Sequence, residues 1–205
     1  NYFEKKSTNI QIEFVSANPT GPLTVGHGRG AILGDIISNI FNWNGYKVER
    51  EYYYNNAGRQ MRILGESVKA RYAKLIGDNI TFPEQGYEGD YIKDIAIRLQ
   101  KKFGNELLVK NDDDSLFKNS AEEYIFNNIK ETLKRININF DSFFNENTLY
   151  DNKSIDKVIS SLRKKNLIYD KDGAIWLSGK KVGREDDRVL VKKTGEPTYR
   201  LPDMA

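Results

Sequence analysis

The spacing of hydrophobic residues changes three times within the first fifty positions. Residues 10–15, IQIEFV, are β-branched or aromatic around single polar positions, which predicts a strand. Residues 16–26 are rich in proline and glycine, which predicts a loop. From 27 to 43 the apolar residues fall at 32, 33, 36, 37, 40 and 41. This spacing predicts a helix with one apolar face that ends before Gly45.

The same order of elements then repeats. The stretch YKVEREYYY at 46–54 predicts a second strand. Asn56 is a candidate cap for a helix over 57–76, where apolar residues recur every three or four positions and which Gly77 ends. The order strand, helix, strand, helix favours a parallel sheet with crossover helices, the arrangement of α/β proteins.

After residue 77 the sequence becomes rich in Lys, Asn, Asp and Glu, and helices are expected at 89–103, 119–136 and 154–165. KNDDDS at 110–115 predicts a charged surface loop. The segments 167–177 and 188–201 predict β-hairpins with turns at KDG and TGEP. The chain therefore divides into a sheet-forming part at 1–77, a mostly helical insertion at 78–168, and hairpins that return to the first domain at 169–205.

Composition excludes several classes of protein. The 205 residues include no cysteine, which excludes disulfides and thiolate metal sites. With a single histidine, a zinc site would depend on carboxylates, so no protein-bound metal is expected. No apolar run is long enough for a membrane span, and the first residues have no signal-peptide core. A cytoplasmic monomer without a membrane partner is expected, and the net charge of +3 is compatible with nucleic acid.

The two ends of the sequence suggest part of a longer protein. The chain begins at Asn1 rather than Met. It ends just after Pro202, which is expected to start a helix. A fragment of a longer chain is therefore expected.

The glycine-rich loop permits two interpretations. GHGRGA at 26–31 fits G-x-G-x-x-A, and the second strand carries an acidic residue, Glu49, about where a ribose ligand would lie, so a dinucleotide-dependent oxidoreductase is one alternative. In that fingerprint the first glycine follows the strand directly. Here about ten residues, including Pro19 and Pro22, separate Val15 from Gly26, the first glycine of the pattern. This distance argues against the dinucleotide alternative.

The other interpretation is a nucleotide bound at a helix start. A helix N-terminus presents unpaired N–H groups and a positive dipole, both of which attract phosphate. Glycines without a Cβ let a nucleotide approach the backbone. His27 could donate a hydrogen bond to a phosphate oxygen as charge builds on it. This combination favours nucleotidyl transfer, with ATP split at its α-phosphate.

Four stretches carry a resemblance to a known family. PLTVGH resembles the HIGH signature of class I aminoacyl-tRNA synthetases. The longer EFVSANPTGPLTVGHGRGAILGD, followed by EYYYNNAGRQM, GDYIKDIA and GEPTYRLPDMA, closely resembles the arginyl-tRNA synthetases, in the expected order and over nearly the whole chain. The resemblance implies a Rossmann-like catalytic domain with a mostly helical connective insertion. It also implies an arginine–tRNA ligase that forms arginyl-adenylate from L-arginine and ATP, with Mg²⁺, and then loads tRNA(Arg).

The sequence departs from the family pattern in two ways. Thr24 replaces the first histidine of the signature, and a hydroxyl cannot become a cation. No KMSKS-like loop is present, nor are the anticodon-binding and N-terminal tRNA-binding domains. The chain alone is therefore not expected to complete the reaction. A non-enzymatic tRNA-binding module remains a third alternative.

The resemblance assigns roles to individual residues. His27 and Thr24 are the expected catalytic residues, and the alternative for the histidine is a helix cap. ATP is expected at Pro22, Gly26, His27, Gly28 and Gly30. The HIGH-like motif runs through Ala17, Asn18, Pro19, Thr20, Gly21, Pro22, Leu23, Thr24, Val25, Gly26 and His27.

Arginine is expected to contact residues from both ends of the chain. Glu13 stands in a strand that should be buried, so it needs a cation, and a guanidinium pairs with carboxylate through two hydrogen bonds. The alternatives are a solvated edge position or an internal lysine partner. Ser16 and Asn18 follow this strand, where turn chemistry is the competing explanation. Tyr199 and Asp203 match family residues that close on the guanidinium, although Asp203 would equally suit a helix N-terminus.

Overall fold

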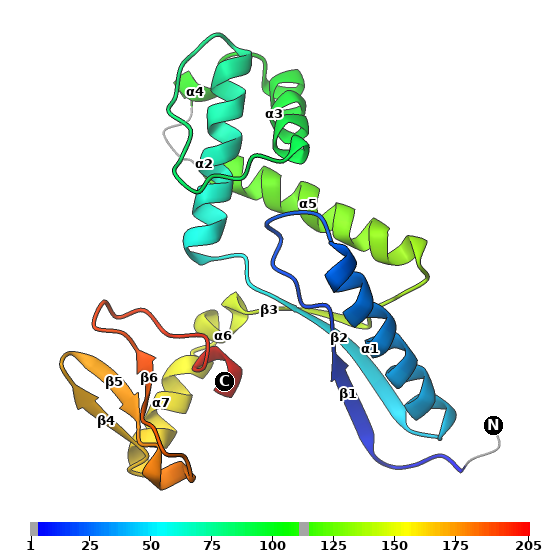
Figure 1. The fold of residues 1–205 in the computed structure, drawn as a ribbon, viewed down its shortest axis with the longest axis vertical. Coiled ribbons are helices and arrows are strands. Elements are labelled where there is room, and N and C mark those ends of the chain that lie inside the picture. Colours follow the sequence, from blue (N-terminus) through cyan, green and yellow to red (C-terminus); the bar gives the residue numbers. More distant parts are fainter. Residues whose placement is uncertain (1–3, 111–114) are drawn as a thin grey trace. The chain divides into compact units, whose positions relative to one another are not determined.

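The computed structural model describes residues 4–110 and 115–205, and the chain forms two compact units (Figure 1). Unit 1 is Asn1–Asn145 and unit 2 is Glu146–Ala205. This division does not coincide with the boundaries expected after residues 77 and 168, because the segment expected to be helical contributes a strand to the first sheet. Most of the predicted charged loop at 110–115 lies outside the described residues.

Unit 1 is built on a parallel sheet, as the sequence predicted. Its strands are β1 (Asn9–Glu13), β2 (Lys47–Tyr54) and β3 (Ser142–Asn145), in the order β1-β2-β3. Helix α1 (Val25–Trp43) is the crossover between β1 and β2. Strand β3 was not predicted, because its four residues are too few for an alternation that would identify a strand.

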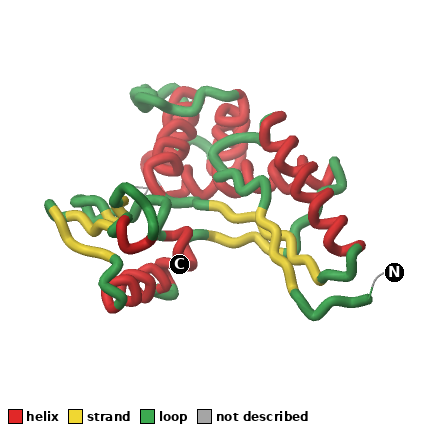
Figure 2. Tube along the Cα trace, turned by 60° about the horizontal axis from the view of Figure 1, so that its bottom comes forward, coloured by secondary structure: helices red, strands yellow, loops and turns green. Residues whose placement is uncertain are grey.

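The other helices of unit 1 are α2 (Gly58–Leu75), α3 (Asp90–Phe103), α4 (Leu107–Lys110) and α5 (Ser115–Arg135). Helix α2 packs against α3 and α5. The helices lie on one side of the strands (Figure 2). Their shared core includes the fully buried residues Tyr52, Met61, Leu64, Tyr72, Ile92, Phe117, Ile125 and Ile129.

Two details of the helix starts differ from prediction. The N-cap of α2 is Ala57, whose N–H donates to Asn55 Oδ1 at 2.7 Å. The predicted cap, Asn56, instead donates its amide to Glu122 Oε1 at 2.7 Å. Helix α5 begins at Ser115, four residues before its predicted start at 119.

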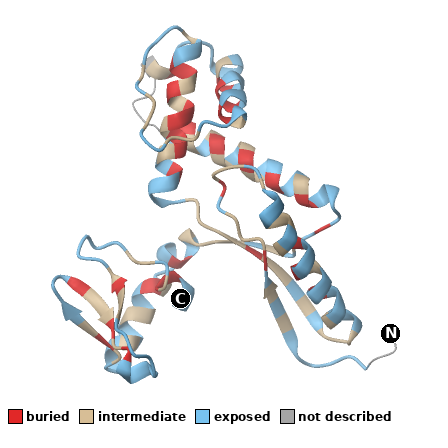
Figure 3. Cartoon of the chain, viewed as in Figure 1, coloured by how far each residue is buried: buried red, intermediate tan, exposed pale blue. Residues whose placement is uncertain are grey.

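Helix α1 turns its small residues, rather than its apolar stripe, toward the sheet. Its buried residues are Ala31, Gly34 and Ser38. A Cβ on Gly34 would lie 2.2 Å from the Phe14 ring, so the helix approaches β1 too closely for a larger side chain. The predicted apolar face is largely exposed in this chain: the exposed fractions range from 44% to 53% at Ile32, Leu33, Ile36, Ile37 and Ile40. Figure 3 shows this exposed side of the helix in pale blue.

Unit 2 begins with two helices, α6 (Asn147–Asp151) and α7 (Ser154–Lys164). An antiparallel sheet follows, with β4 (Ile168–Lys171), β5 (Ala174–Leu177) and β6 (Arg188–Val191) in the order β4-β5-β6. Single 3₁₀ turns, η1 (Lys180–Val182) and η2 (Pro202–Met204), complete the unit. No helix in either described range, 4–110 or 115–205, is long and apolar enough to cross a bilayer.

One predicted hairpin is confirmed and the other is partly wrong. The KDG turn joins β4 to β5, with φ of 53° at Asp172 and 76° at Gly173, the left-handed geometry that two-residue hairpin loops require. In the second segment only β6 is a strand. Its return half makes a single bridge, between Val191 and Pro197. The helix expected at Pro202 is one 3₁₀ turn.

Candidate active site at the β1–α1 loop

The loop after β1 starts with an unusual backbone turn. Val15 has φ of 66° and Ser16 has φ of 45°, both in the left-handed region. A β-branched residue there is a conformational outlier, and each such residue costs about 1–3 kcal/mol. The chain holds this turn only because contacts from other elements compensate for the cost.

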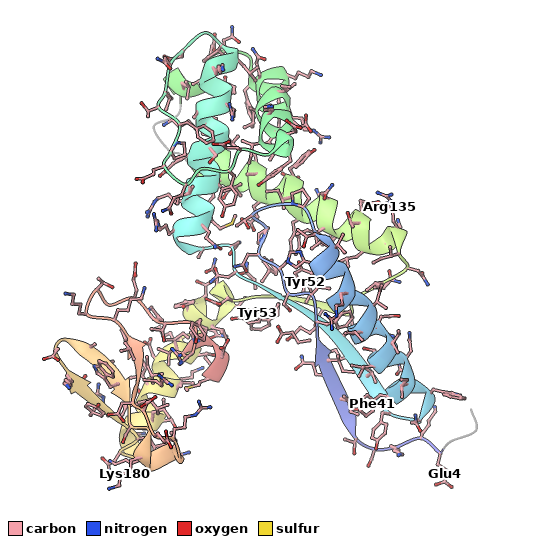
Figure 4. The ribbon with its side chains drawn as sticks, in the orientation of Figure 1. Glu4, Phe41, Tyr52, Tyr53, Arg135 and Lys180 are labelled. Atoms are coloured by element: carbon pink, nitrogen blue, oxygen red, sulfur yellow. The ribbon has the colours of Figure 1, made fainter. Side chains whose placement is uncertain are left out.

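Tyr52 supplies the main contact that holds the loop. Its phenol oxygen donates to the Ala17 carbonyl at 2.8 Å and accepts from the Ala17 N–H at 3.2 Å. The side chain is fully buried on β2, against Phe126, Phe140 and Phe143. Burial raises the pKa of this phenol to about 12. Tyr52 and Tyr53, both labelled in Figure 4, are adjacent in the strand and leave opposite faces of the sheet.

Two predicted arginine contacts also tie the loop to the end of β2. Ser16 Oγ accepts from the Tyr53 N–H at 3.2 Å, and Asn18 Oδ1 accepts from the Asn55 N–H at 2.9 Å. The carbonyl side of the Asn18 amide is thus engaged within the protein. The NH₂ group of that amide and the hydroxyl proton of Ser16 are the groups that a ligand could meet.

Helix α3 holds the middle of the loop. Tyr91 donates its hydroxyl to the Thr20 carbonyl at 2.9 Å, and burial raises the pKa of this phenol to about 12. A Cβ on Gly21 would lie 3.2 Å from the same hydroxyl oxygen, so glycine lets the tyrosine approach closely. Pro19, in the same loop, is buried. The loop is therefore tied to both β2 and α3.

Helix α1 starts two residues earlier than predicted, at Val25, with Thr24 as its N-cap. The Thr24 N–H donates to His27 Nδ1 at 3.0 Å, and the threonine hydroxyl lies 3.1 Å from the same nitrogen. Because Nδ1 accepts a hydrogen bond, the neutral imidazole carries its proton on Nε2. His27 is thus a helix cap through one nitrogen and an available donor through the other.

The glycines of the motif are not explained by packing within the described residues. A Cβ at Gly28 or Gly30 would meet no atom within 4 Å, and one at Gly26 would make only an ordinary contact with Thr24 Oγ1 at 3.6 Å. The first turns of α1 border an open hollow of about 540 Å³, lined by Val25, Gly28, Arg29, Ile32 and Leu33. These positions leave room for a ligand at the helix start.

Glu13 does not lie in a buried strand, contrary to expectation. It is exposed on β1, at the edge of the sheet, which corresponds to the solvated alternative. It pairs in register with Glu51. Burial raises the pKa of Glu51, and the nearby charges of Glu13 and Glu49 raise it further. The open face of the sheet at this edge is therefore negative.

Tyr199 and Asp203 belong to unit 2. Tyr199 is 68% exposed, and the Arg200 guanidinium lies 4.5 Å from its ring centroid. Asp203 is in the first turn of η2, as predicted, and lines a hollow of about 210 Å³ together with Leu177, Arg184, Arg188, Arg200 and Met204. Within the described ranges, no three His, Asp or Glu side chains come together as a metal site.

Together, a parallel sheet and a histidine at the start of the first crossover helix define an α/β protein with a candidate nucleotide site. The catalytic-domain model of the class I tRNA synthetases (R) matches residues 2–205. The chain belongs to this family. The glycines at 26, 28 and 30 lie inside α1 rather than in a tight strand-to-helix turn, which disfavours the dinucleotide alternative.

Curated relatives agree with the family. An arginine–tRNA ligase of Desulfotalea psychrophila is 55% identical over 196 residues, which are 96% of this chain and 35% of that protein. An arginine–tRNA ligase of Prosthecochloris aestuarii is 54% identical over 205 residues, 98% of this chain and 37% of that protein. The chain thus spans little more than a third of these curated relatives.

Solved structures support the fold. A Campylobacter jejuni crystal structure described as a candidate arginyl-tRNA synthetase aligns with a TM-score of 0.88 at 37% identity, over 98% of this chain and 44% of that one. The arginyl-tRNA synthetase of Thermus thermophilus, at 22% identity and a TM-score of 0.67, shares the fold over 98% of this chain and 35% of that one.

The residues that hold the loop were not predicted from the sequence. The pattern placed Tyr52 in the second predicted strand and gave its hydroxyl no role. It gave no role to Tyr91 either. The signal lay in the stretches EYYYNNAGRQM and GDYIKDIA, which carried the family resemblance and which contain these two tyrosines.

Proposed function

We propose that the whole protein to which this chain contributes is an arginine–tRNA ligase. A carboxylate oxygen of arginine attacks the α-phosphorus of ATP, the bond to the β-phosphate breaks, and pyrophosphate leaves. A terminal ribose hydroxyl of tRNA(Arg) then attacks the arginyl carbonyl, and AMP leaves. Relatives that are named arginine–tRNA ligase and more than half identical over nearly the whole chain support this proposal.

The observation that carries the proposal is the hydrogen bond from the Thr24 N–H to His27 Nδ1, because it leaves Nε2 protonated at a helix N-terminus. Nε2–H donates to a phosphate oxygen as negative charge develops at the α-phosphorus. Thr24, in place of the first signature histidine, fixes the tautomer and direction of the ring. Gly26, Gly28 and Gly30, with Pro22, let the nucleotide lie close to the backbone.

Substrate arginine is assigned to polar groups of the loop and to family positions in unit 2. The Glu13 carboxylate pairs with the guanidinium, and its negative neighbour Glu51 strengthens the attraction for a cation. Ser16 and Asn18 hold the backbone groups of the amino acid. On family grounds, Tyr199 and Asp203 remain proposed guanidinium contacts. ATP arrives as its Mg²⁺ complex, and the enzyme acts as a cytoplasmic monomer.

The test is arginine-dependent ATP–pyrophosphate exchange by the whole protein, with tRNA supplied. Exchange is expected with arginine and not with lysine. A guanidinium donates two parallel hydrogen bonds to a carboxylate, whereas the lysine ammonium is a point charge and leaves the second of these bonds unformed. His27→Ala should lower kcat by about 10²–10³-fold. Equal exchange with lysine would overturn the carboxylate argument. Binding of NAD with no exchange would overturn the ligase, and tRNA binding with no exchange would leave a tRNA-binding module.

A further inference from the structure

The net positive charge of the chain lies in unit 2. Residues 146–205 contain thirteen lysines and arginines against ten aspartates and glutamates, whereas residues 1–145 contain nineteen of each. The excess is concentrated around α7. Between positions 153 and 165 there are five cations and a single acid, Asp156. Unit 2 is therefore the part of this chain most attractive to a polyanion.

Helix α7 separates apolar and basic faces. Ile155 is buried and Val158, Ile159 and Leu162 are half-buried on one side. On the other side, exposed side chains line an open hollow of about 560 Å³: Lys153, Asp156, Lys157, Ser160, Ser161, Lys164 and Lys165.

Three of these lysines form a row along the helix. Lys153, Lys157 and Lys164 are four and seven residues apart, about one and two helical turns, so they project in nearly the same direction. At 1.5 Å per residue the row is about 16 Å long. One strand of a nucleic-acid duplex presents a phosphate about every 3.4 Å of its axis, so the row spans several phosphates. The hydroxyls of Ser160 and Ser161 add neutral donors within the row.

Local structure does not explain this row. No described residue forms an ion pair with Lys153, Lys157 or Lys164, whereas Arg163 on another side of the helix pairs with Asp170 at 2.5 Å. Lys153 is the N-cap, with φ of 60°. A non-glycine residue in this conformation costs energy, and a cation near a helix N-terminus is unfavourable. Asp156, in contrast, lies in the first turn, where the dipole favours an acid.

We propose that the basic row of α7, Lys153, Lys157 and Lys164, binds the phosphate backbone of a nucleic acid. This inference rests on the proposed function for the identity of the strand, which is tRNA. The contacts are to phosphates and carry no base specificity. The row contributes affinity and a salt dependence to tRNA binding, and it has no part in binding arginine or ATP.

The test compares two triple variants of the whole protein in tRNA binding, measured from low to high salt. The first variant is Lys153→Gln, Lys157→Gln and Lys164→Gln. The matched control carries the same charge change on exposed lysines at the ends of α2, α3 and α5: Lys74→Gln, Lys101→Gln and Lys134→Gln. Each lost phosphate contact lowers the slope of log K against log salt by about 0.9, so the first variant should lose about two to three. The control should change the slope by less than about one.

Steady-state arginylation gives the second readout. The first variant should raise the KM for tRNA and leave the KM for arginine unchanged. If the first variant binds tRNA with the salt slope and the KM of the unmodified protein, the proposal that the row binds tRNA is refuted. If the unmodified protein binds tRNA but shows no arginine-dependent exchange, the ligase proposal fails. The change in the salt slope between the two variants still tests whether the row binds tRNA. Loss of binding to phosphatidylserine vesicles, with tRNA binding retained, would assign the row to a membrane surface and overturn the proposal.

Discussion

Removing the hydroxyl of Tyr52 should destabilise the protein and loosen the β1–α1 loop. Tyr52→Phe keeps the ring in its aromatic cluster and deletes only the oxygen that contacts Ala17 twice, at 2.8 and 3.2 Å. The Ala17 N–H and carbonyl then lose their partner. Leaving such groups unsatisfied costs about 1–3 kcal/mol of unfolding free energy. For a chain of this size, each kcal/mol lowers Tm by about 2–4 °C.

A second tyrosine provides a matched control. Tyr72 is also fully buried, and its hydroxyl donates to the Gly104 carbonyl at 2.7 Å and accepts from the Leu107 N–H at 3.3 Å. Tyr72→Phe therefore removes the same pair of bonds among the helices, away from the loop. Both variants should lose similar stability in urea denaturation of the chain. Only Tyr52→Phe should lower arginine-dependent exchange in the whole protein, because only it frees the strained turn at Val15 and Ser16.

Two results would refute this reasoning. If Tyr52→Phe unfolds at the same urea concentration as the unmodified chain, the two hydrogen bonds contribute nothing and the turn is held by other contacts. If Tyr72→Phe reduces exchange as much as Tyr52→Phe, the effect of the loop variant is a general loss of stability. Excess ATP and arginine could restore exchange in Tyr52→Phe but not in Tyr72→Phe. That result would indicate that the loop of Tyr52→Phe adopts its substrate-binding conformation in a smaller fraction of the molecules.

Further predictions concern α1, its histidine and the buried phenols. Gly34→Ala should destabilise the chain by more than about 2 kcal/mol, because its Cβ would lie 2.2 Å from the Phe14 ring. Gly30→Ala meets no atom within 4 Å, so thermal denaturation should show a gain of about 0.5–1 kcal/mol, while nucleotide binding weakens. Thr24→Pro removes the N–H that fixes His27 together with the hydroxyl of the N-cap, so kcat should fall and Tm should drop by about 2–4 °C; a normal kcat would exclude the tautomer argument. Burial raises the pKa values of Tyr52 and Tyr91 to about 12, so an absorbance titration of the unmodified chain, compared with Tyr52→Phe and Tyr91→Phe, should show that these phenols ionise above pH 10. Their contribution to stability is full below pH 10 and should fall between pH 10 and 12.

The strongly periodic part of the sequence predicted the fold well. The strands at 10–15 and 46–54 and the helices at 27–43, 57–76, 89–103 and 154–165 are present, with ends shifted by a few residues. Gly77 and Gly104 end helices in left-handed conformations, as glycines at such positions usually do. These features depend on residues close in sequence, which is why pattern alone finds them.

Features that depend on distant contacts were missed. The four residues of β3 become a strand only because β2 offers a partner, with Tyr53 paired to Phe144 and their rings stacked 5.7 Å apart. The apolar stripe of α1 predicted the helix but not its orientation. Periodicity shows that a face is apolar, and the close approach of Gly34 to Phe14 determines which face meets the sheet.

The candidate site shows the same division between local pattern and distant contact. The motif predicted His27 at a helix start, but the state of its ring depends on the Thr24 N–H. The strained turn at Val15 and Ser16 is held by Tyr52, thirty-five residues from its partner Ala17, and the loop beyond it by Tyr91, seventy-one residues from Thr20. Tyr91 belongs to α3, within the segment that composition alone marks as an insertion. Because its hydroxyl donates directly to the Thr20 carbonyl, this helical segment helps to position the β1–α1 loop and is more than an appendage to the sheet.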